Sequence, residues 1–162
     1  MKKNSSEPSD EKSQRSSSKK LIFWRWFWLG FLAISLGYAW HSFYVPPYEM
    51  DWVEDVTAAN DLATKSDKNV MLFFTAKWCA PCRIMKREVF ADDEVQSLIR
   101  AEIVPVMIYT DSPGGEDLID QYRIGTTPVT IFTDGQGNVL DYAVGGVSKP
   151  DFLALLGRVA AR

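Results

Sequence analysis

The chain has 162 residues, of which 46% are hydrophobic and 24% are charged, and its formal net charge is −3. This length suits one globular domain with an appendage, and the acidic balance argues against a nucleic-acid partner, whose phosphates require a basic surface. The two cysteines are too few for the disulfide framework of a small secreted domain or for the four ligands of a structural zinc site.

The charges are distributed unevenly along the chain. Residues 1–45 contain seven Lys/Arg and three Asp/Glu, a net charge of +4, whereas residues 46–162 contain eleven and eighteen, a net charge of −7. The basic residues of the first part lie mostly beside an apolar segment, and this is where membrane topology is decided.

The first 44 residues are predicted to be a tail followed by a membrane anchor. Residues 1–20 are polar and too poor in apolar side chains to offset the entropy of ordering, which predicts a disordered cytoplasmic tail. Residues 21–44 are predicted to be a single transmembrane helix, because about 20 apolar residues span a hydrocarbon core of roughly 30 Å. Aromatic residues gather near both of its ends, as in interfacial belts: Trp24, Trp26 and Trp28, then Tyr38, Trp40 and Tyr44.

A cleaved signal peptide is the alternative for this apolar segment. The run is longer than a typical signal-peptide core, and no small-x-small cleavage site follows it, so the anchor is favoured. Lys19, Lys20 and Arg25 lie before or at the start of the span, and acidic residues follow it. The positive-inside rule therefore predicts a cytoplasmic N-terminus and an extracytoplasmic domain over residues 45–162, periplasmic if the source is bacterial. Such a compartment tolerates disulfides.

Residues 45–162 have the size of one domain and alternate helical and strand patterns. Continuous apolar runs and a hairpin signal predict the strands, and apolar spacing with capping residues predicts the helices. Pro105 is expected to weaken one strand or to mark an interrupted edge. The predicted helices are 51–64, 81–90 with Ile84, Met85 and Val89 facing inward, 92–100, 116–122 and 150–160, and the strands are 70–74, 103–109, 129–133 and 139–144.

The chemistry-bearing motif is Cys79-Ala80-Pro81-Cys82, placed between a buried strand and a helix. Cys79 then falls at the helix N-terminus, where unpaired N–H groups and the macrodipole favour a thiolate and lower the cysteine pKa. Cys82 lies one turn further on, close enough to bridge, and Lys77 and Arg83 add positive charge nearby. A static disulfide or two buried thiols would be the structural alternative, but the strand–motif–helix context favours redox chemistry.

At these residues the chain resembles the thioredoxin superfamily, over roughly residues 49–160. The resemblance depends on the stretch from Phe74 to Cys82, on the following helix, and on Gly125-Thr126-Thr127-Pro128 before a hairpin. The stretch from Lys86 to Val95 looks like the branch of secreted or membrane-anchored thioredoxin-like domains, which includes the terminal domain of transmembrane thiol:disulfide interchange proteins. It implies an α/β thioredoxin-like fold, with a central mixed sheet flanked by helices and here preceded by one transmembrane helix.

The resemblance also implies roles for the residues around the cysteines. Pro128 would be cis and lie against the disulfide, and Thr127 would pair its backbone with an extended client segment. Catalytic roles would fall to Cys79 and Cys82, and client binding to Trp78, Ala80, Pro81, Thr127 and Pro128.

Three positions depart from the pattern of thioredoxin. Phe73 stands where thioredoxin carries a buried Asp, and Met107 aligns with the Lys that pairs with that Asp. Arg87 stands near the place of the usual kink proline. Without the buried relay, Cys82 would have to be activated by water or by a group of the substrate.

Two further patterns are interpreted as structural. The run Asp111, Glu116, Asp117 and Asp120 suggests a cation site, but such a run is more often a solvated face. Gly135-x-Gly137 is too short for a nucleotide loop and predicts a hairpin turn. No metal and no cofactor are expected.

These observations predict a thiol–disulfide oxidoreductase. Ala80-Pro81 lacks the His found between the cysteines of strongly oxidising relatives, which favours a reductant with a potential nearer about −270 mV than about −120 mV. The predicted partners are disulfide-containing extracytoplasmic client proteins and a transmembrane electron donor, with the membrane contacted through residues 21–44. The alternative is a non-catalytic thioredoxin-like module that binds peptides or serves as a scaffold.

Overall fold

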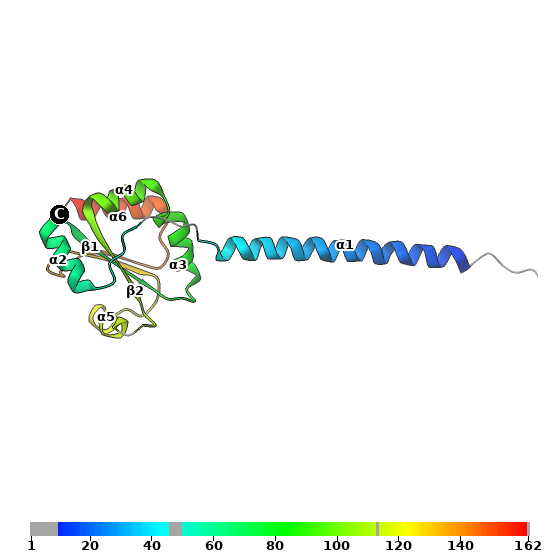
Figure 1. The fold of residues 1–162 in the computed structure, drawn as a ribbon, viewed down its shortest axis with the longest axis horizontal. Helices are drawn as coiled ribbons and strands as arrows, with labels where there is room; N and C mark the ends of the chain where they lie inside the picture. Colours follow the sequence, from blue (N-terminus) through cyan, green and yellow to red (C-terminus); the bar gives the residue numbers. More distant parts are fainter. Residues whose placement is uncertain (1–9, 46–49, 113, 162) are drawn as a thin grey trace, which may run out of the picture. The chain divides into compact units, whose positions relative to one another are not determined.

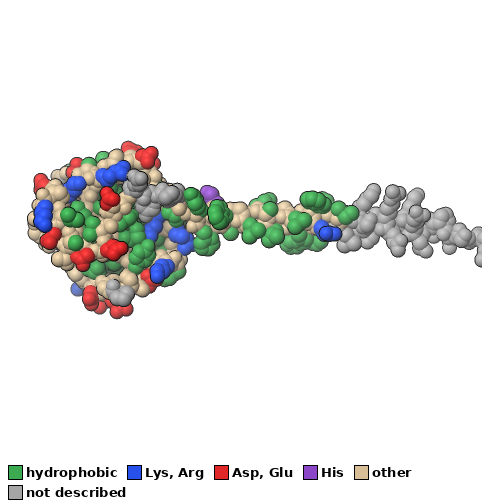
Figure 2. All heavy atoms as spheres, viewed as in Figure 1, with side chains coloured by type: hydrophobic (Ala, Val, Ile, Leu, Met, Phe, Trp, Pro, Cys, Tyr) green, Lys and Arg blue, Asp and Glu red, His purple; other side chains and the backbone are tan. Residues whose placement is uncertain are grey.

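The computed structural model describes residues 10–45, 50–112 and 114–161, and the chain forms two compact units, Met1–Tyr44 and Val45–Arg162. The first unit contains helix α1 (Asp10–Phe43). Within it, Ile22–Phe43 is long and apolar enough to cross a membrane, with a mean hydropathy of 1.2 and no burial inside the protein. Hydrophobic side chains cover this segment in Figure 2.

Helix α1 extends into the stretch predicted to be a disordered tail. Residues 10–20 are helical, and residues 1–9 lie outside the described residues. Adding a turn to an existing helix requires no new nucleus, so polar residues can continue a helix that an apolar segment has started.

The second unit is built on a four-stranded mixed sheet with the strand order β2-β1-β3-β4 (Figure 1). The edge strand β2 runs parallel to β1, and β3 is antiparallel to both β1 and β4. The expected α/β fold with a mixed central sheet is confirmed. The strands are β1 (Asn69–Thr75), β2 (Ile103–Tyr109), β3 (Val129–Thr133) and β4 (Val139–Val144).

Helices cover both faces of this sheet. Because successive strand side chains point to opposite faces, the buried residues separate into two apolar clusters. The cluster containing Phe73, Phe90 and Phe152 lies under α3, η1, α4 and α6, and the cluster containing Leu72 and Phe74 lies under α2 and α5. The helices are α2 (Val56–Ser66), α3 (Ala80–Met85), the π-helical turn η1 (Lys86–Phe90), α4 (Asp93–Glu102), α5 (Gly115–Tyr122) and α6 (Lys149–Ala160).

The predicted helix over 51–64 is wrong at its start. Helix α2 begins at Val56 because the Asp55 side chain accepts the Ala58 N–H at 2.7 Å, which makes Asp55 the N-cap. The preceding residues are extended, and Val53 forms a parallel bridge with Val106. Trp52 packs on the core instead, with its ring 5.5 Å from that of Phe90.

Strand β2 is continuous although it contains Pro105. This strand lies at an edge of the sheet, where a proline leaves no ladder hydrogen bond unmade. The Pro105 carbonyl points away from β1 and accepts the Val53 N–H at 2.9 Å. The expected interruption is therefore absent, and the expected edge position is confirmed.

The helix after the cysteine motif is not regular. It changes from α3 to the π-helical turn η1 at Lys86, next to Arg87, where the resemblance to thioredoxin would place a kink proline. Met85 and Val89 are buried, as expected, but Ile84 is 47% exposed, so the prediction that it faces inward is wrong. The buried face of this helix is formed by Cys82, Met85 and Val89, and Ile84, two residues after Cys82, lies on the other side.

An ion pair joins the starts of α4 and α6. Lys149 Nζ lies 2.9 Å from both Asp92 Oδ2 and Glu94 Oε2. Hydrogen bonding from Lys149 lowers the pKa of Asp92, whose side chain also caps α4. Both helices are thereby tied together over the same face of the sheet.

Substitution of Phe90 tests the packing of this core. Phe90 is fully buried, and its ring lies 4.9 Å from that of Phe73 and 5.5 Å from those of Trp52 and Phe152. We expect Phe90→Ala to lower the free energy of unfolding by about 3–5 kcal/mol, since it leaves a cavity among these rings. Urea unfolding followed by tryptophan fluorescence measures this. Leu98→Ala, at a position 41% exposed, is the control, and equal effects of the two substitutions would contradict the proposed core.

Candidate active site

The two cysteines lie at the junction between strand β1 and helix α3. Strand β1 ends at Thr75, and Cys79 is the N-cap of α3 with extended backbone angles. The Cys79 N–H donates to the Ala76 carbonyl at 3.1 Å, which closes the connecting turn. Pro81 occupies the first helical turn, where its missing N–H costs nothing.

Cys79 and Cys82 form a disulfide, with their Cα atoms 5.3 Å apart. The Cys82 backbone N–H also donates to Cys79 Sγ at 3.2 Å. When the disulfide is reduced, the sulfur at this N-cap is the acceptor of a helical N–H, and such a donor favours the thiolate over the thiol. The arrangement therefore suits Cys79 as a nucleophile and Cys82 as the residue that closes the disulfide again.

The disulfide is covered, whereas the residues around it are exposed. Cys79 and Cys82 are each only 1% exposed. Trp78 is 73% exposed, and Ala80 and Pro81 also reach the surface. A partner protein would thus meet these three residues first, in agreement with their predicted role in client binding, which stays a prediction.

The Thr127–Pro128 peptide bond is cis, as the resemblance implied. Pro128 is buried, Thr127 is half-buried, and the Pro128 carbonyl accepts the Gly145 N–H at 2.8 Å. Contact of these two residues with a client stays a prediction. A groove of about 460 Å³ borders the same loop, and its lining includes Gly125, Thr126 and two exposed side chains of β4, Tyr142 and Val144.

The positions that differ from thioredoxin are neighbours in the sheet. Phe73 and Met107 are register partners on β1 and β2, and Phe73 is fully buried. An apolar pair thus replaces the buried Asp and Lys that thioredoxin has there, and neither side chain can exchange a proton.

Sequence reasoning missed Lys86, which reaches this apolar pair from the helix. Its Nζ donates to Met107 Sδ at 3.3 Å and lies 6.0 Å from the ring centroid of Phe73 and 5.2 Å from that of Tyr109. Desolvation by burial lowers the pKa of Lys86. Its position four residues after Cys82, one helical turn, is a signal that the sequence contained. Of the two cations that the sequence did indicate, Lys77 is exposed and Arg83 is half-buried.

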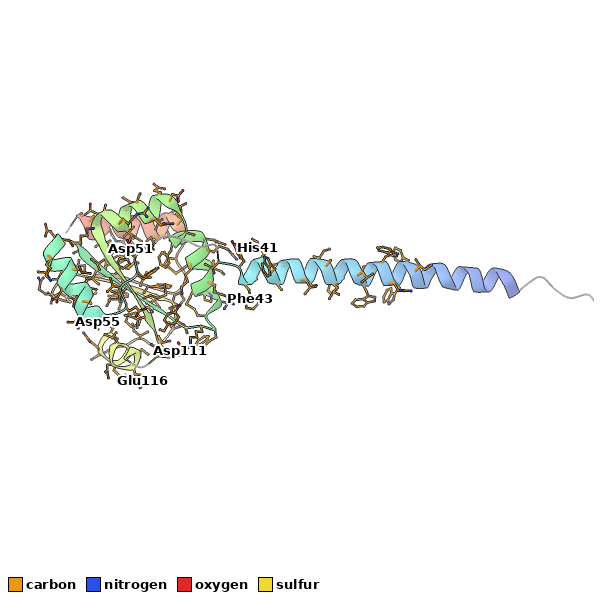
Figure 3. The ribbon with its side chains drawn as sticks, in the orientation of Figure 1. His41, Phe43, Asp51, Asp55, Asp111 and Glu116 are labelled. Atoms are coloured by element: carbon orange, nitrogen blue, oxygen red, sulfur yellow. A yellow bond between two sulfur atoms is a disulfide. The ribbon has the colours of Figure 1, made fainter. Side chains whose placement is uncertain are left out.

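The acidic run near α5 does not form a cluster. Asp111 and Glu116 lie around the start of α5 (Figure 3), and Glu116, Asp117 and Asp120 are exposed. Within the described ranges, no three His, Cys, Asp or Glu side chains are arranged to hold a metal ion. Gly135 and Gly137 lie in the turn between β3 and β4, where the Asp134 carboxylate accepts the N–H groups of Gln136 and Asn138.

Comparison with known proteins agrees with this geometry. A family model described as a thioredoxin-like domain matches residues 56–160. The chain belongs to this thioredoxin-like family.

Individual relatives fall into two groups. The chain is 35% identical over 109 residues to thiol:disulfide interchange protein DsbD of Ralstonia nicotianae, a match that covers 65% of this chain and 18% of DsbD. It is 30% identical over 106 residues to thioredoxin H3 of Arabidopsis thaliana, covering 65% of this chain and 80% of that protein. The chain thus matches about a fifth of the length of DsbD and most of a thioredoxin.

Solved structures show the same fold. A thioredoxin from Thermus thermophilus superposes with a TM-score of 0.62 at 27% identity, over 68% of this chain and 88% of that one. The C-terminal domain of Neisseria meningitidis DsbD, in its oxidised form, gives a TM-score of 0.56 at 19% identity, over 66% of this chain and 97% of that domain. The family, these relatives and the Cys79–Cys82 disulfide together support thiol–disulfide oxidoreductase function.

The helix N-terminus predicts unequal reactivity of the two thiols. In the reduced chain at neutral pH, we expect limiting iodoacetamide to modify Cys79 at least about tenfold faster than Cys82, which corresponds to about one pKa unit of thiolate stabilisation at the N-cap. Mass spectrometry of the peptides measures both rates. The Cys79→Ser variant is the control for Cys82 alone, and equal rates for the two thiols would contradict activation at the N-cap.

Proposed function

We propose that the chain is a membrane-anchored thiol–disulfide oxidoreductase that reduces disulfides of extracytoplasmic client proteins through Cys79 and Cys82. The observation that carries the proposal is the Cys79–Cys82 disulfide at the start of α3, with Cys79 Sγ accepting the Cys82 N–H. Two sulfurs at this spacing can store and release one electron pair, so the reaction needs no cofactor.

The proposed reaction has two displacements. The Cys79 thiolate attacks one sulfur of the client disulfide, which forms a mixed disulfide and releases the other client sulfur as a thiolate. Cys82 then attacks Cys79 Sγ, which releases the second client thiol and leaves the internal disulfide that the structure contains. The client gains two electrons and two protons, and the chain loses them.

The proposed direction follows from the residues between the cysteines. Ala80 and Pro81 carry no charge, so the Cys79 thiolate is stabilised mainly by the helix terminus and is less stable than in strong oxidants. A less stable thiolate makes the dithiol form a better reductant. Trp78, Ala80 and Pro81 would contact the client from the exposed rim, and Thr127 and Pro128 would contact its extended segment.

The membrane setting is part of the proposal. A span over residues 21–44 with Lys19, Lys20 and Arg25 at its beginning supports a cytoplasmic N-terminus and an extracytoplasmic domain over residues 45–162. In that compartment the disulfide has to be reduced again after each turnover. A transmembrane carrier of electrons is the partner that this requires, and the similarity to DsbD supports it.

Turnover of a protein disulfide tests the proposal. We expect the full chain in detergent micelles to accelerate the reduction of insulin by dithiothreitol, followed as turbidity. Cys79→Ser should reduce the rate to that of dithiothreitol alone, because the attacking sulfur is gone, whereas Cys82→Ser should accumulate mixed disulfides on Cys79. Equal rates for Cys79→Ser and the parent chain would instead support a peptide-binding module without redox turnover.

Labelling of single cysteines tests the topology. In a Cys79→Ser/Cys82→Ser background, we expect Ala101→Cys, on the exposed side of α4, to react with a membrane-impermeant maleimide in intact cells. Ser5→Cys in the tail should react only after the cells are lysed, because the positive residues keep that end in the cytoplasm. The reverse labelling pattern would place the domain in the cytoplasm.

A further inference from the structure

The surroundings of reduced Cys82 disfavour its thiolate form. It is 1% exposed and belongs to the apolar cluster that contains Phe73, Met85 and Val89. Burial in such surroundings raises the pKa of a thiol, because the thiolate loses its hydration. Yet Cys82 has to attack as a thiolate when it releases the client, and Phe73 and Met107 offer it no proton acceptor.

Lys86 brings a positive charge to the same face of the helix as Cys82. Its backbone N–H donates to the carbonyls of Cys82 and Arg83, so it stands one helical turn beyond Cys82. Side chains four residues apart lie on the same face of a helix, and a helical side chain leans toward the preceding turn. Lys86 Nζ lies among Met107, Tyr109 and Phe73, at the end of the sheet where β1 leads into the cysteine turn.

The charge of Lys86 is not neutralised by a carboxylate. Among the described residues, no Asp or Glu oxygen lies within 4.0 Å of its Nζ, and burial is the cause that lowers its pKa. Tyr109 on β2 is the titratable side chain that faces it across the helix–sheet contact, while Arg87 and Glu88 of η1 pair with each other at 2.8 Å. Two opposite unit charges attract each other strongly at short range in partly buried surroundings, so a nearby thiolate would be the strongest counter-ion available to Lys86.

We propose that the Lys86 ammonium stabilises the thiolate of Cys82 during release of the client. In this way Lys86 would activate Cys82 in place of the buried Asp–Lys pair of thioredoxin, whose positions are occupied here by Phe73 and Met107. This inference rests on the dithiol reaction proposed above. Lys86 acts through Cys82, with which it forms no hydrogen bond in the described disulfide form, and is a positioning residue for charge rather than a catalytic residue.

The attack of Cys82 on the mixed disulfide needs no further reactant. The Cys82 S–H bond breaks, the bond between Cys82 Sγ and Cys79 Sγ forms, and the bond between Cys79 Sγ and the client sulfur breaks. The client sulfur leaves with the electron pair of that bond and takes up the proton from Cys82 by way of solvent. Lys86 remains protonated throughout, which is why its effect is electrostatic.

A chromogenic disulfide separates this step from the first attack. The reduced full chain in detergent micelles is mixed with equimolar 5,5′-dithiobis(2-nitrobenzoate) in a stopped-flow instrument. Attack by Cys79 releases one nitrothiobenzoate anion, and attack by Cys82 on the mixed disulfide releases the second. We expect Lys86→Met to slow the second phase about tenfold at neutral pH and to move its pH profile upward by about one unit, with the first phase unchanged.

Matched variants make the result decisive. Lys86→Arg keeps the charge and should restore the second phase, whereas Lys86→Gln, which is polar but neutral, should be as slow as Lys86→Met. Lys65→Met, which removes a charge from the exposed surface of α2, should leave both phases unchanged. Thermal melts of each oxidised variant verify folding, and Lys86→Gln carries the test if Lys86→Met does not fold.

Two different failures can be distinguished in this experiment. A normal second phase in Lys86→Met and Lys86→Gln, or one as slow in Lys86→Arg as in Lys86→Met, would overturn the role of Lys86 and leave the dithiol reaction intact. A parent chain that releases neither anion faster than an ordinary thiol would overturn the proposed function itself.

Discussion

Strand β1 pairs with a neighbouring strand on each edge and is covered by helices on both faces. This packing fixes the position of the turn that follows it, which carries Cys79. It pairs with β2 along its whole length and with β3 over Val70–Phe74. All of Val70–Phe74 is fully buried. A strand confined in this way cannot shift its register without turning its apolar side chains from one cluster to the other. The turn that follows Thr75 therefore presents Cys79 at one defined position.

The same confinement explains why the surroundings of Cys82 are apolar. Phe73 points into the cluster beneath α3 and η1, and its register partner Met107 lies beside it. A charge at either position would be desolvated between sheet and helix. Lys86 enters this layer from the helix. The residue as a whole is half-buried, and its Nζ lies against Met107, Phe73 and Tyr109.

Much of this arrangement was predictable from local patterns. Strands β3 and β4 agree with their predicted bounds residue for residue, because Asp134 to Asn138 form the turn that their composition indicates. Helix α4 starts within the predicted range 92–100, because the Asp92 side chain accepts backbone N–H groups within the next three residues and caps the helix there. The position of Cys79 at the N-terminus of a helix was likewise predictable, because it depends on a strand, a turn and a helix that are contiguous in sequence.

The errors arose where distant parts of the chain decide the local structure. The apolar spacing around Trp52 and Val53 fits a helix, but both residues instead pack on elements that follow much later in the sequence. Ile84 is exposed because Cys82, Met85 and Val89 form the buried face of this helix, and Ile84, two residues after Cys82, lies on the other side. The contacts of Lys86 require the β1–β2 register, which places Met107 and Tyr109 within its reach.

Pro105 has a consequence for how copies of this chain coexist. It has no N–H to offer at the outer edge of β2, and the Val53 N–H already occupies its carbonyl. An edge that is blocked in this way is a poor template for a strand from another molecule. Confinement to a bilayer, as proposed for this chain, crowds copies into two dimensions and multiplies their collisions. The blocked edge thus protects against aggregation in the setting where crowding would otherwise promote it.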